Sequence, residues 1–143
     1  MTYEIGYAIP GAAFRVGRYR MLRPGLARYE PWWTDPGRAI ALPERRYPLD
    51  LRSNFTVAME ERIALPAGWR AVSMPRSRRS SHRNGSWSIA AGLGPGQVIY
   101  RRQATLADPY VRTADYRAFR QSMLDYLDAR QGWIVLQTDL NVN

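Results

Sequence analysis

The stretch that decides the fold is NFTVAMEERIAL, which runs from Asn54 to Leu65. Apolar and polar residues alternate along it, as they do in a strand with one buried face, because successive side chains of a strand point to opposite sides. The face that we expect to be buried consists of Phe55, Val57, Met59, Ile63 and Leu65. Glu61 interrupts this face, so we expect it near the sheet edge or paired with an arginine.

Turn residues divide the chain on the C-terminal side of this strand. Pro66–Gly68 predicts a turn into a partner strand from Trp69 to Met74. Asn84-Gly85 predicts a tight hairpin turn, and a second turn is expected over residues 92–96. Together these signals predict an antiparallel meander over residues 47–106.

The pattern changes from a strand period to a helix period after residue 113. The apolar residues that then recur at helical spacing are Tyr116, Phe119, Met123, Tyr126 and Leu127. One amphipathic helix is therefore expected over residues 114–131, with Thr113 as its N-cap and Gly132 just beyond its C-terminal end. A closing strand is expected over residues 133–137.

The N-terminal part, residues 1–46, combines expected strands with an irregular segment. Residues 13–22 alternate loosely and predict a strand, whereas the Pro-, Gly-, Trp- and Arg-rich residues between 22 and 46 are typical of a long connection. The length of 143 residues suits one domain, and no apolar run is long enough to span a membrane. We predict a single, mainly β domain over residues 1–143: antiparallel, sandwich-like sheet or sheets, one C-terminal amphipathic helix and a closing strand.

The composition argues against a self-sufficient enzyme. Cysteine is absent, histidine occurs once, and no group of residues has the spacing of a metal site. We therefore predict no catalytic residue, no metal site and no cofactor; an enzyme would need a polar pocket with Glu61 or Asp50 buried in it. The N-terminus lacks a signal-peptide pattern. We expect a cytoplasmic protein if the chain is complete, and a periplasmic or secreted one if it is a fragment of an exported protein.

Few residues are candidates for acid–base or metal chemistry. His82 is expected to be a solvated loop histidine, since no acid near it in the sequence would orient a catalytic Ser-His pair. Asp125 and Asp128 lie three apart on the expected helix. An ion-paired solvent face is favoured there over a cation site, because two carboxylates are too few to enclose a hard cation.

Arginine supplies all 21 basic residues, and the formal net charge is +9. The arginines are spread along the chain, which favours a general replacement of lysine by arginine over one binding stripe. Residues 75–85 form a polar, basic segment that we expect to be a loop. Trp69 and Trp87 flank it and either stack bases or belong to the core. The candidates for binding a polyanion are Arg76, Arg78, Arg79 and Arg83.

Several short motifs, taken in order, resemble one family. They are Arg45-Arg46-Tyr47-Pro48-Leu49, Ile63-Ala64-Leu65-Pro66-Ala67-Gly68-Trp69, Val72-Ser73-Met74-Pro75, Tyr100-Arg101-Arg102, Tyr116-Arg117-Ala118-Phe119-Arg120 and Ile134-Val135-Leu136. Over about residues 40–137 the chain resembles the C-terminal β-domain of bacterial transglutaminase-like proteins of the DUF3857/DUF3858 type. The resemblance implies a β-sandwich-like domain that accompanies a Cys-His-Asp core and does not itself hold the nucleophile.

These observations lead to two hypotheses of function. The first is a non-catalytic accessory or protein-interaction module, whose partner is another protein chain such as a transglutaminase-like core. The adjacent Trp32 and Trp33 either cover the core or dock on that partner as a hot spot, and we take them as its contact residues. The alternative is a module that binds a polyanion or nucleic acid through the basic segment.

Overall fold

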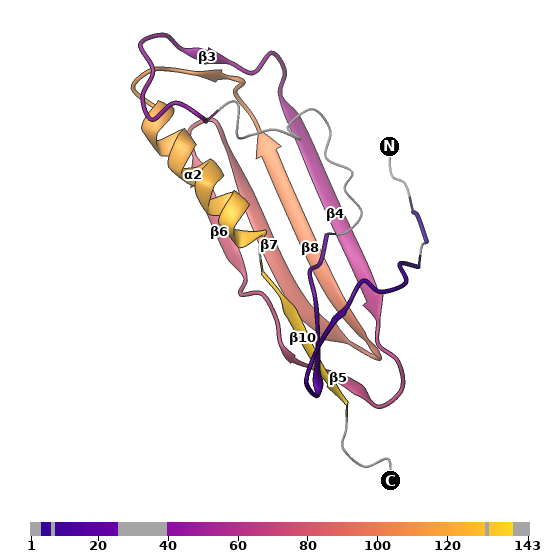
Figure 1. The fold of residues 1–143 in the computed structure, drawn as a ribbon. Coiled ribbons are helices and arrows are strands. Elements are labelled where there is room, and N and C mark those ends of the chain that lie inside the picture. Colours follow the sequence, from indigo (N-terminus) through magenta and orange to yellow (C-terminus); the bar gives the residue numbers. More distant parts are fainter. Residues whose placement is uncertain (1–3, 7, 26–39, 131, 139–143) are drawn as a thin grey trace.

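The structure is a computed structural model, and it describes residues 4–6, 8–25, 40–130 and 132–138 (Figure 1). Ten strands and one helix lie in these residues. In chain order they are β1 (Phe14–Val16), β2 (Tyr19–Leu22), β3 (Leu49–Asp50), β4 (Phe55–Ala64), β5 (Trp69–Ser73), β6 (Arg78–His82), β7 (Gly85–Gly94), β8 (Gln97–Leu106), β9 (Tyr110–Val111), α2 (Tyr116–Ala129) and β10 (Ile134–Thr138).

The strands form three sheets, and every pair of neighbouring strands is antiparallel. Sheet A has the order β1-β2-β10-β5, sheet B consists of β3 and β9, and sheet C has the order β4-β8-β7-β6. The predicted fold class, mainly β with antiparallel sheets, one helix near the C-terminus and a closing strand, is confirmed.

Strand β4 has the two faces that its alternation predicts. It pairs with β8 along its whole length, from Phe55 opposite Leu106 to Ala64 opposite Gln97. Half-buried and exposed residues alternate along it without a break. Glu61 lies on the half-buried face of this edge strand, and its carboxylate accepts a hydrogen bond from the backbone N–H of Gly25.

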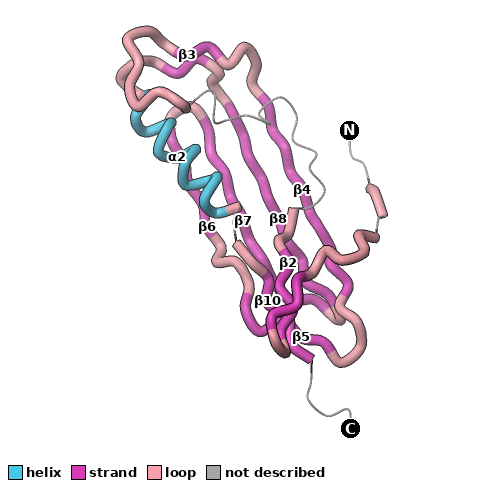
Figure 2. The backbone as a smooth tube through the Cα atoms, viewed as in Figure 1, coloured by secondary structure: helices cyan, strands magenta, loops and turns pink. Residues whose placement is uncertain are grey.

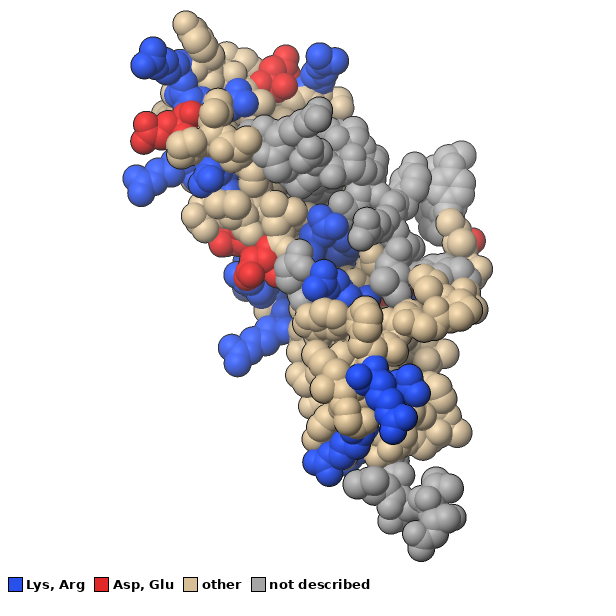
Figure 3. Space-filling view, viewed as in Figure 1, with Lys and Arg blue, Asp and Glu red and all other residues tan. Residues whose placement is uncertain are grey.

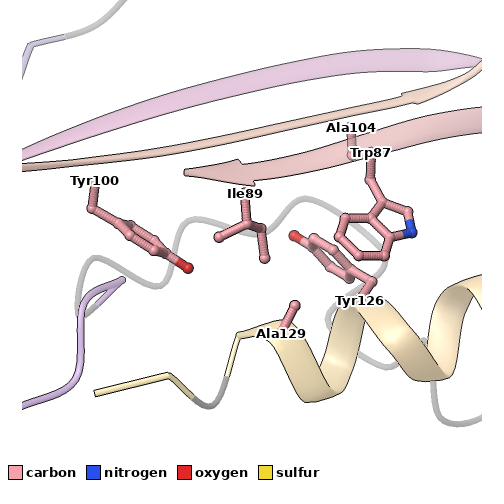
Figure 4. Packing of buried hydrophobic residues seen from close by; sticks show 6 residues of the cluster. All are labelled: Trp87, Ile89, Tyr100, Ala104, Tyr126 and Ala129. Carbon is pink, nitrogen blue, oxygen red and sulfur yellow. The ribbon is translucent and has the colours of Figure 1, made fainter. Parts of the chain in front are cut away.

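The inner face of sheet C is covered by two different parts of the fold. Helix α2 packs over one half of it and sheet A over the other, as Figures 1 and 2 show. Under α2, the cluster of Figure 4 consists of Trp87, Ile89, Tyr100, Ala104, Tyr126 and Ala129. Under sheet A, the buried residues are Val98, Leu22, Ile134 and Leu136.

The predicted partnership between β4 and the strand after Pro66–Gly68 is wrong. That strand, β5, forms, but it pairs with β10 in sheet A. The physical reason is length. Strand β8 pairs with all ten residues of β4, whereas β5 has only five residues and could pair with half of them. Gly68, at φ +74°, instead takes the chain out of one sheet and into the other.

Two other predictions of local structure need correction. Residues 13–22 are not one strand but a hairpin, because Gly17 at φ +60° turns the chain between β1 and β2. The basic segment is not wholly a loop, since Arg78–His82 forms strand β6 along β7. The meander is therefore continuous only through β6, β7 and β8.

The ends of the helix also differ from their predicted positions. Asp115, not Thr113, is the N-cap, and its side chain makes no capping hydrogen bond. Arg130 is the C-cap. Gly132 is needed for a close approach and not for a left-handed turn, because a Cβ there would lie 2.6 Å from the Cβ of Pro75.

We predict that Gly85→Ala destabilises the domain by about 2 kcal/mol or more. A Cβ at residue 85 would lie 2.0 Å from the backbone carbonyl oxygen of Thr105 on the adjoining strand β8. Gly92→Ala is the matched control in the same strand β7, where a Cβ would meet no atom within 4 Å. Urea unfolding of both variants measures the difference, and equal stability would contradict the close approach of the two strands at Gly85.

Candidate interaction surface

His82 is a packing residue and not the solvated loop histidine that the sequence predicts. It ends β6 and is half-buried, with its ring edge-on to Phe119 at a centroid distance of 5.6 Å. Its Nδ1 accepts a hydrogen bond from the backbone N–H of Asn84 at 3.2 Å. Burial lowers the pKa of His82 below its ordinary value. Partial burial therefore favours the neutral imidazole, and the two contacts that the structure describes for His82 are with a ring and a backbone N–H, whereas a Ser-His pair needs an orienting carboxylate.

The helical acids have separate partners. Asp128 pairs with Arg78 at 2.6 Å, and the carboxylate of Asp125 accepts a hydrogen bond from Gln121 at 2.9 Å. Asp50 is exposed and accepts a hydrogen bond from the backbone N–H of Arg52. Within the described ranges, no three His, Asp or Glu residues are grouped so that they could hold a metal ion.

The four arginines of the basic segment do not share one surface. Arg78 lies opposite Ile89 and reaches the helix, whereas its neighbour Arg79 lies opposite Ser88 on the other face of sheet C. Arg83 lies 3.8 Å from Asp115, and Arg76 is exposed beyond the strand. Trp87, which the sequence places beside them for stacking or for the core, is 3% exposed and belongs to the core.

A shallow hollow of about 410 Å³ lies on the outer face of sheet C. Its lining residues are Arg79, Ser80, Ser81, Ser86, Trp87, Ser88 and Gln103. They include hydroxyl, amide and guanidinium groups but neither a carboxylate nor an imidazole. The hollow therefore has no group suited to general acid–base catalysis near neutral pH.

The outer face of sheet A is the surface that stands out for its exposed apolar side chains. Cross-strand pairing places Phe14, Met21 and Val135 in one row and Val16 beside Tyr19 in the next. Phe14 is 62% exposed and Val16 is 53% exposed. Side chains of this kind are normally scattered singly over a monomer, so their grouping on one sheet face indicates an interaction surface.

Trp133 and Val72, which lie beside these rows, extend the exposed face. Trp133 packs edge-on to Phe14 at a centroid distance of 6.0 Å, and the guanidinium of Arg23 lies 4.7 Å from the centre of the Trp133 ring. Val72, at a register shift between β5 and β10, is 42% exposed. We call the whole set the sheet A surface, and it consists of Phe14, Val16, Tyr19, Met21, Val72, Trp133 and Val135.

The sequence pointed to a different contact site. Trp32 and Trp33, the predicted partner-binding residues, lie outside the described residues. The sheet A surface was missed because alternation alone does not tell which face of a short strand is covered. The signal that could have found it was Gly17-Arg18, which breaks the run over residues 13–22 into two strands and makes Phe14 and Val16 lie beside Tyr19 and Met21.

The comparisons with known proteins identify the family of this chain and a solved structure with a similar fold. Residues 27–136 match the family model described as "Domain of Unknown Function with solved-structure structure (DUF3858)". The chain therefore belongs to the DUF3858 family, which confirms that part of the sequence resemblance. A comparison with curated proteins finds no significant match.

The fold is also similar to part of a solved crystal structure described as a "putative protease" from Parabacteroides distasonis ATCC 8503. The TM-score is 0.65 at 12% sequence identity, and the match covers 83% of this chain. The chain spans only 23% of the length of that protein. At this identity the likeness shows the fold alone. In the described part of the chain, no helix has both the length and the apolarity to cross a membrane.

We predict that His82 titrates below its ordinary pKa of 6.5 and makes the domain less stable in mild acid. Burial favours the neutral imidazole, so the unfolded chain takes up the proton at a higher pH than the folded chain does. The free energy of unfolding therefore decreases as the pH falls through about 6.5 and toward the folded pKa. Because His82 is the only histidine, its ring-proton NMR titration gives this pKa directly.

A His82→Gln variant is the control for the same experiment. It should lose this part of the pH dependence, which is measured by urea unfolding between about pH 7.5 and pH 5.5, above the usual range of carboxyl groups. A titration midpoint at or above 6.5 would show that the imidazole is not buried as described.

Proposed function

We propose that this chain is a non-catalytic accessory domain that binds another protein through the sheet A surface. The observation that carries the proposal is the grouping of Phe14, Val16 and Val72, all more than two-fifths exposed, on one sheet face, where Trp133 packs against Phe14. An apolar centre with charged groups around it is the usual anatomy of a protein interface. No described element covers this face.

The partner that we propose is a transglutaminase-like core, in the same protein or in another chain. Membership of the DUF3858 family supports this, as does the small share of the solved relative that this fold occupies. A domain of this size beside a larger protein is expected to contribute contacts and positioning. We retain Trp32 and Trp33 as further contact residues of the same proposal.

A second proposal is the binding of a polyanion. Two of the four candidate arginines, Arg78 and Arg83, lie beside carboxylates. Arg76 and Arg79 would therefore have to supply most of the contacts to the polyanion. The donor-rich hollow beside Arg79 supports this alternative. Binding to DNA or RNA that falls steeply with salt is its expected behaviour, and no binding at low salt would remove it.

We predict that Phe14→Ser combined with Val16→Ser weakens capture of the partner on the order of tenfold or more. Both side chains are more than half exposed, so their loss should change the free energy of unfolding little. The measurement is capture, by the tagged chain, of each transglutaminase-like protein encoded in the same genome.

The matched control is Leu93→Ser. Leu93 is 62% exposed, as Phe14 is, but it lies on β7 near the hairpin that joins β7 to β8 in sheet C. This variant should bind as the unchanged chain does. If the double variant and the control retain equal capture, the sheet A surface is not the contact.

A further inference from the structure

This inference rests on the proposed function and concerns the chemistry of the partner. Two arginines that flank strand β2, Arg18 and Arg23, lie against aromatic rings of the sheet A surface. The guanidinium of Arg23 is 4.7 Å from the centre of Trp133, and that of Arg18 is 5.1 Å from Tyr19. Arg20 is 5.6 Å from Trp69, but it lies on the opposite face of sheet A, beside Leu22 and Leu136, and is not part of the sheet A surface. Stacked guanidinium groups of this kind are held by the ring quadrupole.

These arginines have no acidic counterpart in their own sheet. The four strands of sheet A read FRV, YRML, WRAVS and IVLQT, and none of them contains Asp or Glu. Among the described residues, no carboxylate lies within 4.0 Å of Arg18, Arg20 or Arg23.

The contrast with the rest of the domain is clear. On sheet C, Glu60 pairs with both Arg62 and Arg101 at 2.7 Å. Near the helix, Arg78 pairs with Asp128. In Figure 3 the red atoms lie mostly over the half that carries α2, whereas blue atoms among tan ones mark the half that carries sheet A.

Stacking prepares these arginines for one kind of ligand. Arg18 already donates one of its N–H groups to the Tyr19 hydroxyl at 2.9 Å, whereas the structure gives Arg23 a ring contact and leaves its planar N–H fork for a ligand. That fork matches a carboxylate with two parallel hydrogen bonds, and less side-chain freedom is lost on binding because the ring already restricts the arginine. The sheet therefore presents prearranged cations beside an apolar centre.

The apolar centre decides between the classes of anionic partner. A nucleic acid backbone would contact the arginines but leave Phe14 and Val16 exposed to water. A lipid surface with anionic headgroups is the competing occupant that the vesicle experiment below separates, because exposed apolar side chains can also enter a bilayer interface. A protein surface with apolar side chains flanked by Asp or Glu covers Phe14 and Val16 and also pairs with the arginines.

We infer that the partner presents an apolar patch flanked by carboxylates, which seats on the sheet A surface and pairs with its stacked arginines. Arg23 is the central receptor, because it lies on Trp133, which itself packs against the exposed Phe14. The partner's acidic groups orient it on the sheet A surface and increase its rate of association, and its apolar groups contribute much of the affinity of the complex.

The test uses the whole chain, labelled with nitrogen-15, and a synthetic amphipathic peptide with leucines on one face and glutamates beside them. Two counterpart peptides carry lysine in place of glutamate, or serine in place of leucine. Vesicles of phosphatidylcholine and phosphatidylglycerol, and oligothymidylate, are the probes for the other classes. The readouts are the dissociation constant and the indole N–H signal of Trp133, with the signal of Trp69, which packs on the opposite face of the sheet, as the reference.

The expected result is that the glutamate–leucine peptide binds most tightly and shifts the signal of Trp133 more than that of Trp69. Arg23→Gln should weaken that binding on the order of tenfold. Arg117→Gln is the matched control, since it removes the same charge from an exposed position on α2. Equal losses in the two variants would overturn the inference, because net charge alone would then explain binding.

Other outcomes separate this inference from the proposed function. If the lysine peptide binds as well as the glutamate peptide, the carboxylate preference is wrong, while an apolar docking surface stands. If vesicles or oligothymidylate bind more tightly than the peptide and shift the same signal, the occupant belongs to another class and the inference fails. If Phe14→Ser with Val16→Ser leaves peptide binding unchanged, the proposed surface itself is wrong.

Discussion

The pairing of β8 with both β4 and β7 along its full length is the interaction on which the rest of the structure depends. Every residue of β8 from Gln97 to Leu106 has a partner on each side. Since side chains alternate between faces, this register directs Val98, Tyr100 and Ala104 inward together. A slip by one residue would turn these side chains to solvent and leave both α2 and sheet A without a surface to cover.

The sequence predicts well what depends on local period, and less well what depends on distant partners. The faces of β4 follow from alternation, and α2 follows from helical spacing, with its ends displaced by a few residues. The sheet to which β5 belongs could not be predicted, because the same Pro-Gly turn serves a hairpin or a change of sheet. Strand β6 lacks apolar residues and becomes a strand only because β7 offers it a partner.

The same distinction explains the candidate surface. Which face of β1 and β2 is exposed depends on β10, more than a hundred residues later in the chain, and on the position of sheet A over sheet C. The number of arginines gives the positive charge of the chain, but it does not tell which arginines pair with carboxylates and which lie against aromatic rings. Only the structure separates arginines that pair with carboxylates, such as Arg62, from those that stack on aromatic rings, such as Arg23. Composition alone makes all of them equivalent.

The order of strands in sheet A has a consequence for the time at which this surface comes into existence. Strand β10 is the last of the described strands to be made on the ribosome, yet it lies between β2 and β5 and joins them. Until it is in place, β1 and β2 form an isolated hairpin, which is marginally stable in water. The row that includes Phe14 and Val135 is therefore completed after the rest of the domain is synthesised. The complete face of sheet A therefore cannot form before the chain has been made as far as Thr138.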